Sequence, residues 1–222
     1  MILSHPIGDL SHDCGASPAE QLERALVRMD RLALPQLYRS CGLNPLYFCE
    51  QVIVPALAGI GEKWDRGELA LSHVYMSGRL CEEFIEQTLP VADAPGNPTR
   101  RVALAVLEDY HLLGKRLVGF VLKGGGIDYL DYGTVNAAEL VARVQRDGVS
   151  VLLISALMLH SALKVREVRE GLDRLGIPCR IVVGGAPFRL DPSLWREVGA
   201  DLCCTQASEV LLAIEKFRGG EP

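Results

Sequence analysis

The segment RVALAVLEDYHLLGK (residues 101–115) begins with an apolar run of strand length and continues into a helical pattern. An uninterrupted apolar strand is typical of a parallel sheet that is covered on both faces. His111 lies in the turn between the two patterns, two residues after Asp109 and three before Gly114. The segment therefore predicts the first strand and helix of an α/β domain, with a histidine just beyond the carboxyl end of the strand.

The same alternation continues to the end of the chain. The further apolar runs are IDYLD, VSVLLIS, CRIVVGG and DLCCT, at residues 127–131, 149–155, 179–185 and 201–205. A helical pattern over 161–175 carries one apolar stripe, formed by Val165, Val168, Leu172 and Leu175. Such alternation predicts βαβ units around a buried parallel sheet. Five strands fit the doubly wound, flavodoxin-like plan with the order 2-1-3-4-5, in which ligands bind beyond the carboxyl ends of strands 1 and 3.

The first part of the chain has patterns that predict only helices. Ser17, Pro18 and Glu20 form a helix-start signature. The apolar residues that follow it at helical spacing are Leu22, Leu26, Met29 and Leu32 or Ala33. Two further helices are expected, one from Asn44 to Trp64 and one over residues 71–89. We therefore predict a helical bundle at 1–90.

A segment rich in proline separates this bundle from the α/β part. Residues 90–100 read PVADAPGNPTR, a composition that interrupts helices and favours a linker. We predict three parts: the helical bundle at 1–90, a linker at 91–100 and an α/β domain at 101–222.

The composition argues against several classes of function. The formal net charge is −5, whereas proteins that neutralise nucleic-acid phosphates carry a positive surface. The seven cysteines are scattered and form no CxxC pair, which argues against a disulfide framework or a zinc site and favours a reducing cytoplasm. No uncharged apolar run reaches the roughly 18 residues that a membrane span requires. We expect a cytoplasmic protein with no nucleic-acid or membrane partner.

Three turns of the predicted sheet carry residues suited to a binding site. His111 follows strand 1, residues 155–157 follow strand 3, and Gly184 and Gly185 follow strand 4. In the predicted order these turns are neighbours at one edge, where glycines allow a ligand to approach the backbone. Asp109 can accept a hydrogen bond from one ring nitrogen of His111, so that the other can bind a metal or a proton. One histidine is too few ligands for a zinc held by protein alone, so a metal at this edge would arrive already ligated.

The spacing of these residues resembles the cobalamin-binding signature DxHxxG, SxL and GG. The residues that match it are Asp109, His111, Gly114, Ser155, Leu157, Gly184 and Gly185. The segments GTVNAAELV (133–141) and GGAPF (184–188) also look like the corresponding family segments. The helical segment from Gly61 to Pro90 is similar to the cap domain of small corrinoid proteins that serve methyltransferase systems for methanol, methylamines or aryl methyl ethers.

The resemblance implies a cobalamin site in the α/β domain. In the family, a protein histidine takes the lower axial position of the cobalt, and the nucleotide tail of the cofactor runs into a slot beside strands 3 and 4. By position, His111 would be the metal ligand, Asp109 its hydrogen-bonding partner and Ser155 a hydroxyl partner of the tail. Further cofactor contacts are expected from Tyr110, Leu112, Gly114, Leu157, Leu159, Gly184, Gly185 and Thr205.

The chain departs from the family pattern GDxHDIGK around this histidine. Glu108 replaces the glycine and Leu112 replaces the aspartate, while Leu159 stands where a hydroxyl residue is common. A bulky acidic residue at the turn predicts a different shape for the loop that carries His111.

The resemblance implies a methyl carrier rather than a catalyst. The cofactor, methylcobalamin when loaded, would receive a methyl group through a substrate-specific methyltransferase and deliver it through an acceptor-side methyltransferase. A reductive activator is a further candidate partner. The proline-rich linker is the natural hinge for a cap that must move between these partners.

Two other functions remain open from the sequence. A cobalamin-dependent sensor or regulatory module would use the same two domains, usually with a helix-turn-helix ahead of them, but only residues 1–16 precede the first helix signal. A flavodoxin-like enzyme would instead use His111 as a general base with a different cofactor. The colour of the purified protein separates these readings, because a corrinoid is red or orange and a flavin is yellow.

Overall fold

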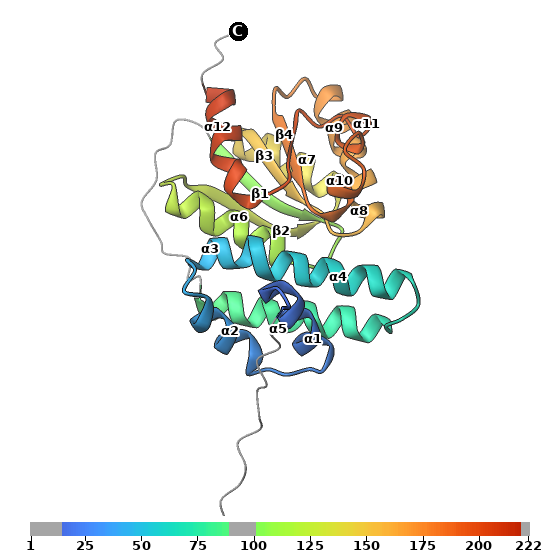
Figure 1. Cartoon of the computed structure of the whole chain (residues 1–222). Helices are drawn as coiled ribbons and strands as arrows, with labels where there is room; N and C mark the ends of the chain where they lie inside the picture. The colour runs from blue at the N-terminus through green and yellow to red at the C-terminus, as the bar shows by residue number, and fades with distance from the viewer. Residues whose placement is uncertain (1–14, 89–100, 219–222) are drawn as a thin grey trace, which may run out of the picture.

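The computed structural model describes residues 15–88 and 101–218, which form a helical half and a sheet-containing half (Figure 1). The sheet has five parallel strands: β1 Arg101–Leu107, β2 Tyr129–Val135, β3 Val149–Ser155, β4 Arg180–Gly184 and β5 Leu202–Cys204. Their order is β2-β1-β3-β4-β5. The predicted doubly wound fold, with β1 beside β3, is therefore confirmed. The predicted linker at 91–100 lies outside the described residues.

Helices cover both faces of the sheet. One face packs against α7 (Ala137–Asp147), α8 (Leu159–Leu163), α9 (Val165–Arg174), α10 (Ala186–Leu190) and α11 (Leu194–Glu197). The other packs against α6 (Leu113–Gly124) and α12 (Val210–Arg218), which follows the 3₁₀ turn η2 (Ala207–Glu209). Along β1, Ala103 and Ala105 belong to the first core, and Val102 and Leu104 to the second. Both faces are buried, which explains the uninterrupted apolar strands of the sequence.

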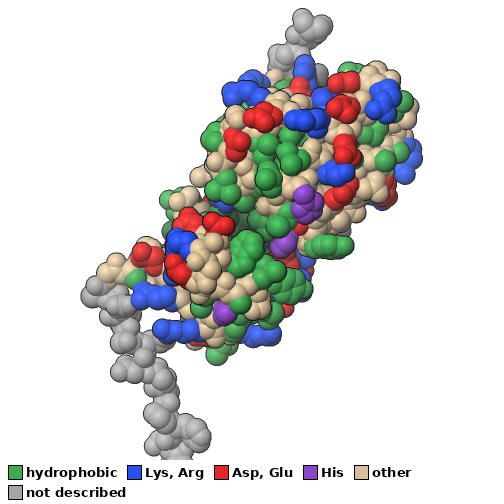
Figure 2. All heavy atoms as spheres, turned by 90° about the vertical axis from the view of Figure 1, so that its right-hand side faces the viewer, with side chains coloured by type: hydrophobic (Ala, Val, Ile, Leu, Met, Phe, Trp, Pro, Cys, Tyr) green, Lys and Arg blue, Asp and Glu red, His purple; other side chains and the backbone are tan. Residues whose placement is uncertain are grey.

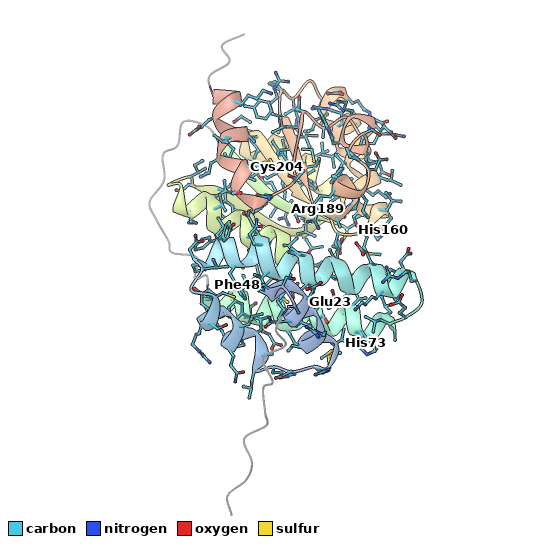
Figure 3. The ribbon with its side chains drawn as sticks, viewed as in Figure 1. Glu23, Phe48, His73, His160, Arg189 and Cys204 are labelled. Carbon is cyan, nitrogen blue, oxygen red and sulfur yellow. The ribbon has the colours of Figure 1, made fainter. Side chains whose placement is uncertain are left out.

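The helical half is a bundle around an aromatic cluster. Its elements are α1 (Pro18–Val27), α2 (Ala33–Cys41), α3 (Pro45–Phe48), the π-helical turn η1 (Cys49–Ile53), α4 (Val54–Asp65) and α5 (Leu71–Thr88). Phe48 is fully buried in it (Figure 3), with the ring of Tyr38 at 5.1 Å and that of Phe84 at 6.0 Å. The predicted capping box is present, because Ser17 and Glu20 each accept the other's backbone N–H. No helix in the described ranges is long and apolar enough to cross a bilayer.

The two halves share α6, the helix that follows His111. Leu117 of α6 is buried in the core of the bundle, whereas Leu122 is buried in the sheet core. Arg116 of the same helix donates a hydrogen bond to the Glu82 carbonyl oxygen of α5 at 3.3 Å and forms an ion pair with Glu86. The start of α6 is therefore fixed with respect to both halves.

Two helix predictions were wrong in their boundaries. The first helix ends at Val27, because Met29 adopts a left-handed backbone with a φ of 58°. The unpredicted helix α2 then begins at Ala33. The helix expected over 161–175 is divided into α8 and α9, which meet at Lys164, and Leu175 lies beyond α9 and is half exposed.

The second strand was also misplaced by the sequence prediction. It begins at Tyr129 rather than at Ile127 and continues to Val135. Ile127 closes the turn after α6 by donating its backbone N–H to the carbonyl oxygen of Leu122 at 2.8 Å. An apolar residue that packs in a turn was thus mistaken for the start of a strand.

Candidate functional site

The three predicted turns meet at the carboxyl edge of the sheet. Asp109, after β1, accepts through Oδ2 the backbone N–H groups of Leu157 and Met158 after β3, both at 3.1 Å. Ala156 donates its N–H to the carbonyl oxygen of Gly184 at 3.0 Å, which joins the β3 turn to the end of β4. These bonds link turns that are far apart in the sequence.

His111 is held by Asp109 within one turn. Its ring Nδ1 lies 2.6 Å from Asp109 Oδ1, and the same oxygen accepts the backbone N–H of His111 at 3.1 Å. Asp109 is 3% exposed, whereas the His111 side chain is 37% exposed. Donation from Nδ1 to the carboxylate favours the tautomer with a lone pair on Nε2. Nε2 of His111 can therefore act as a metal ligand or as a base.

Each member of this pair changes the pKa of the other. Burial favours a higher pKa for Asp109, but hydrogen bonds from His111, Met158 and Leu157 overcome this effect and hold its pKa well below the usual range. The hydrogen bond to Asp109 raises the pKa of His111 against the effect of burial, and the charges of Asp109 and Glu82 add to the increase. Asp109 is thus a stable carboxylate, and His111 is a stronger base than a free imidazole.

The motif glycines lie where the turns leave no room for side chains. A Cβ on Gly185, whose φ is 121°, would lie 1.8 Å from the carbonyl oxygen of Ala156. A Cβ on Gly184 would lie 3.0 Å from a carbonyl oxygen of β5. A Cβ on Gly114 would lie 2.7 Å from Ser155 Oγ, so the first and second motifs are in contact. The fold itself therefore requires glycine at 185, where the clash is with backbone, whereas the contact at Gly114 is with a side-chain hydroxyl that can rotate.

Large apolar side chains are exposed around this edge. They are Tyr110, Leu157, Met158 and Leu159, from the turns and α8, while the helical half exposes Trp64, Leu71 and Tyr75 at the end of α4 and the start of α5. Tyr110 is the most exposed of them, at 91%. Figure 2 shows this side of the molecule, with histidine side chains where the two halves meet and apolar side chains around them. Exposed apolar groups around a few polar atoms are typical of a ligand or partner site.

Glu108, in the turn before His111, has a backbone conformation that glycine adopts more easily than other residues. Its φ is 47°, in the left-handed region. Its N–H donates to the carbonyl oxygen of Val135 at 2.9 Å, and its own carbonyl oxygen accepts the hydroxyl of the buried Ser161 at 3.2 Å. These bonds hold a conformation that costs about 1 kcal/mol for a residue with a Cβ.

Thr205 is the predicted residue least connected to the others. It is exposed after β5, and both its N–H and its hydroxyl donate to the carboxylate of Glu209, at 2.7 and 3.1 Å. Its hydroxyl therefore belongs to the turn that leads into α12.

Sequence reasoning missed Glu82 of α5. This carboxylate is 5% exposed, yet it accepts the backbone N–H of Leu112, next to His111, at 3.0 Å. Glu82 lies in the run CEEFIE, where neighbouring acidic residues are exposed or half-buried. No local pattern distinguishes it from them, because its partner lies in the other half of the molecule.

Comparison with known families identifies both halves. Two family models described as B12 binding domains match the chain, one over residues 100–215 and the other over residues 18–88. The first covers the whole sheet with its turns, and the second covers the helical bundle.

Individual relatives extend over most of the chain. Monomethylamine corrinoid protein 1 of Methanosarcina mazei is 28% identical over 204 residues, which cover 86% of this chain and 92% of that protein. The trimethylamine corrinoid protein of Methanosarcina barkeri is 27% identical over 184 residues, which cover 79% and 83%.

Solved structures share the fold. The monomethylamine corrinoid protein of Methanosarcina barkeri matches with a TM-score of 0.74 and 24% identity, over 89% of this chain and 98% of that one. The methanol:cobalamin methyltransferase complex MtaBC from the same organism matches with a TM-score of 0.51 and 22% identity, over 91% and 80%.

Proposed function

The chain belongs to the B12-binding domain family, and from this premise we propose that it is a corrinoid protein that carries methyl groups between partner methyltransferases. Both of its halves match family models, and the relatives described above are corrinoid proteins by name. The observation that carries the proposal is the His111–Asp109 pair at the point where β1 and β3 lie side by side.

The residues at this edge fit a corrinoid. His111 offers Nε2 as a ligand because Asp109 holds Nδ1, and a single imidazole suffices for a metal whose other ligands come with its macrocycle. Ser155 forms no hydrogen bond with another described residue through its hydroxyl, which leaves that group available to a ligand. The exposed apolar side chains suit the rim of a large ring system.

We assign roles to the site residues on this basis. His111 would bind the cobalt through Nε2, and Asp109 would fix the tautomer of His111 and raise its basicity. Ser155, Leu157, Gly184 and Gly185 would line the slot for the nucleotide tail. Tyr110, Leu112, Gly114 and Leu159 would contact the cofactor around His111, and Thr205 would lie at the outer end of the slot.

The corrinoid, when bound, supplies a cobalt centre that accepts and donates methyl groups. The chain's own residues would orient this cofactor, supply an imidazole nitrogen to its cobalt and cover its apolar surface. We further propose a substrate-side and an acceptor-side methyltransferase as partners, with a reductive activator. A cytoplasmic location is part of the proposal, in keeping with the free thiols of all described cysteines.

Reconstitution tests this function directly. The protein is refolded with excess hydroxocobalamin, passed through a desalting column and examined by its absorption spectrum. We expect a red protein that retains the corrinoid, and an H111A variant that retains it with an altered spectrum. A colourless protein, or one purified with a yellow flavin, would refute the proposal.

A further inference from the structure

A buried carboxylate of the helical half contacts the turn that carries His111. Glu82 Oε1 accepts the backbone N–H of Leu112 at 3.0 Å, and its Oε2 pairs with Arg79 at 2.9 Å. Burial of a charge is unfavourable unless the charge is paired and hydrogen-bonded, and Glu82 meets both conditions. The contact is thus fully satisfied, and it crosses between the two halves of the molecule.

The start of α6 lacks a cap from its own sequence. Leu112 is the residue that precedes the helix, and its side chain forms no capping hydrogen bond. The positive end of a helix dipole favours a nearby negative charge. Glu82 supplies this charge from α5, while Arg116 of α6 bonds the Glu82 carbonyl oxygen at 3.3 Å.

Glu82 and Asp109 hold opposite ends of one short turn. Asp109 joins the beginning of the turn to Leu157 and Met158 in the sheet half. Glu82 joins its end, at Leu112, to the helical half. His111 lies between these two anchors, so its imidazole is placed by both halves at once.

We infer that Glu82 is a positioning residue that fixes the His111 turn to the helical half and thereby makes ligation of the cobalt by His111 depend on the docking of that half. The inference rests on the proposed function, because it requires His111 to be the axial ligand. A helical half that moves away to admit a partner withdraws Glu82 and frees the end of the turn. Motion of the helical half is thereby coupled to the histidine ligand of the metal.

The chain provides a matched control for this role. Glu50 of η1 also belongs to the helical half, and it accepts the N–H of Ser208 at 2.9 Å and the Ser208 hydroxyl at 3.2 Å. Ser208 lies in η2, after β5, and not in the His111 turn. Loss of the Glu50 carboxylate therefore removes a polar contact between the halves but none to that turn, and the apolar core that Leu117 shares with the helical half keeps the halves docked.

Electron paramagnetic resonance of the protein loaded with cob(II)alamin measures the ligation. In protein labelled with ¹⁵N-histidine, a ligating protein histidine splits the cobalt lines into doublets, whereas the cofactor's own base splits them into triplets. We expect doublets in the wild type. In E82A, the ratio of the doublet signal to all other cobalt signals should fall at least about threefold, because the Leu112 N–H loses its hydrogen bond to a charged acceptor. E50A should keep the wild-type ratio, and E82Q, which retains an acceptor, should lie between E82A and the wild type.

The outcomes distinguish failure of ligation by His111 from failure of the role of Glu82. A wild-type spectrum without doublets would contradict ligation by His111 and hence the proposed role of the site. Doublets at wild-type strength in E82A, or equal losses in E82A and E50A, would overturn the role of Glu82 alone. Circular dichroism monitors folding of each variant. If E82A does not fold, E82Q carries the test, and an unchanged doublet ratio in E82Q then overturns the inference.

Discussion

The two anchors of the His111 turn differ in how they arise from the sequence. Asp109 is part of the turn and makes its bonds within the sheet half, to His111, Leu157 and Met158. Glu82 reaches the same turn from the helical half, through the single bond to Leu112. The first anchor is formed entirely by residues of the sheet half. The second exists only when the two halves are docked, so it can respond to their movement.

Removal of the Asp109 carboxylate should break the first anchor with the largest effect. D109A leaves the backbone N–H groups of Leu157 and Met158 without an acceptor. We expect a loss of about 3–5 kcal/mol in the free energy of unfolding, measured with urea. D109N, which retains one acceptor oxygen, should lose less. A stability of D109A within about 1 kcal/mol of the wild type would show that the turn does not depend on this anchor.

The glycine pair after β4 tests how closely the turns at the first anchor approach each other. A Cβ at position 185 would collide with the carbonyl oxygen of Ala156, which lies in the turn that Asp109 binds. G185A should therefore lower the free energy of unfolding by about 3 kcal/mol, and G184A, whose contact is looser, by about 1 kcal/mol. Urea unfolding of the two variants side by side measures this order. Equal stabilities would contradict the close approach of the two turns.

Replacement of Glu108 by glycine should have a smaller effect of opposite sign. Glu108 has a φ of 47°, and E108G removes the steric strain of its Cβ. The gain in the free energy of unfolding should be about 1 kcal/mol, reduced in part by the greater freedom of glycine in the unfolded chain. E139G, in the first turn of α7 where Glu139 also pairs with Arg143, is the control without a positive φ and should be destabilising. A destabilised E108G would mean that the Glu108 side chain contributes more than its backbone strain costs.

The pH dependence of stability gives the smallest expected signal. The hydrogen bond to Asp109 raises the folded-state pKa of His111 above 6.5. Its contribution to stability is therefore fully present below the unfolded-state pKa near 6.5 and is lost as the pH rises through the higher folded-state value. The difference in Tm between the wild type and H111N, measured without corrinoid, should be largest at about pH 5.5 and decline above about pH 6.5. A difference that grows with pH would contradict the His111–Asp109 pairing.

Much of the sheet half could be predicted because its signals are local. A strand buried on both faces is apolar throughout, and the strand order follows from the topology of α/β units, so the meeting of the turns at Asp109, Ser155 and Gly184 could be inferred from spacing. Errors occurred where tertiary packing overrode the local pattern. Ile127 packs in a turn rather than opening a strand, and Met29 breaks a helical pattern with a left-handed backbone.

The second anchor could not be predicted, for a related reason. Glu82 resembles its exposed neighbour Glu86 in the sequence, and only the docking of α5 on α6 buries it beside Leu112. Contacts between elements that a linker separates leave no periodic trace in either element. A site to which both halves of a protein contribute can therefore be predicted from the sequence only in part.

We propose above all that a histidine of this chain binds the cobalt of a corrinoid at the carboxyl edge of the sheet. The most direct measurement is the electron paramagnetic resonance spectrum of the wild-type protein and of H111A, both labelled with ¹⁵N-histidine and loaded with cob(II)alamin. We expect doublet splitting in the wild type and its complete absence in H111A. Triplet splitting in the wild type, or doublets that persist in H111A, would contradict it.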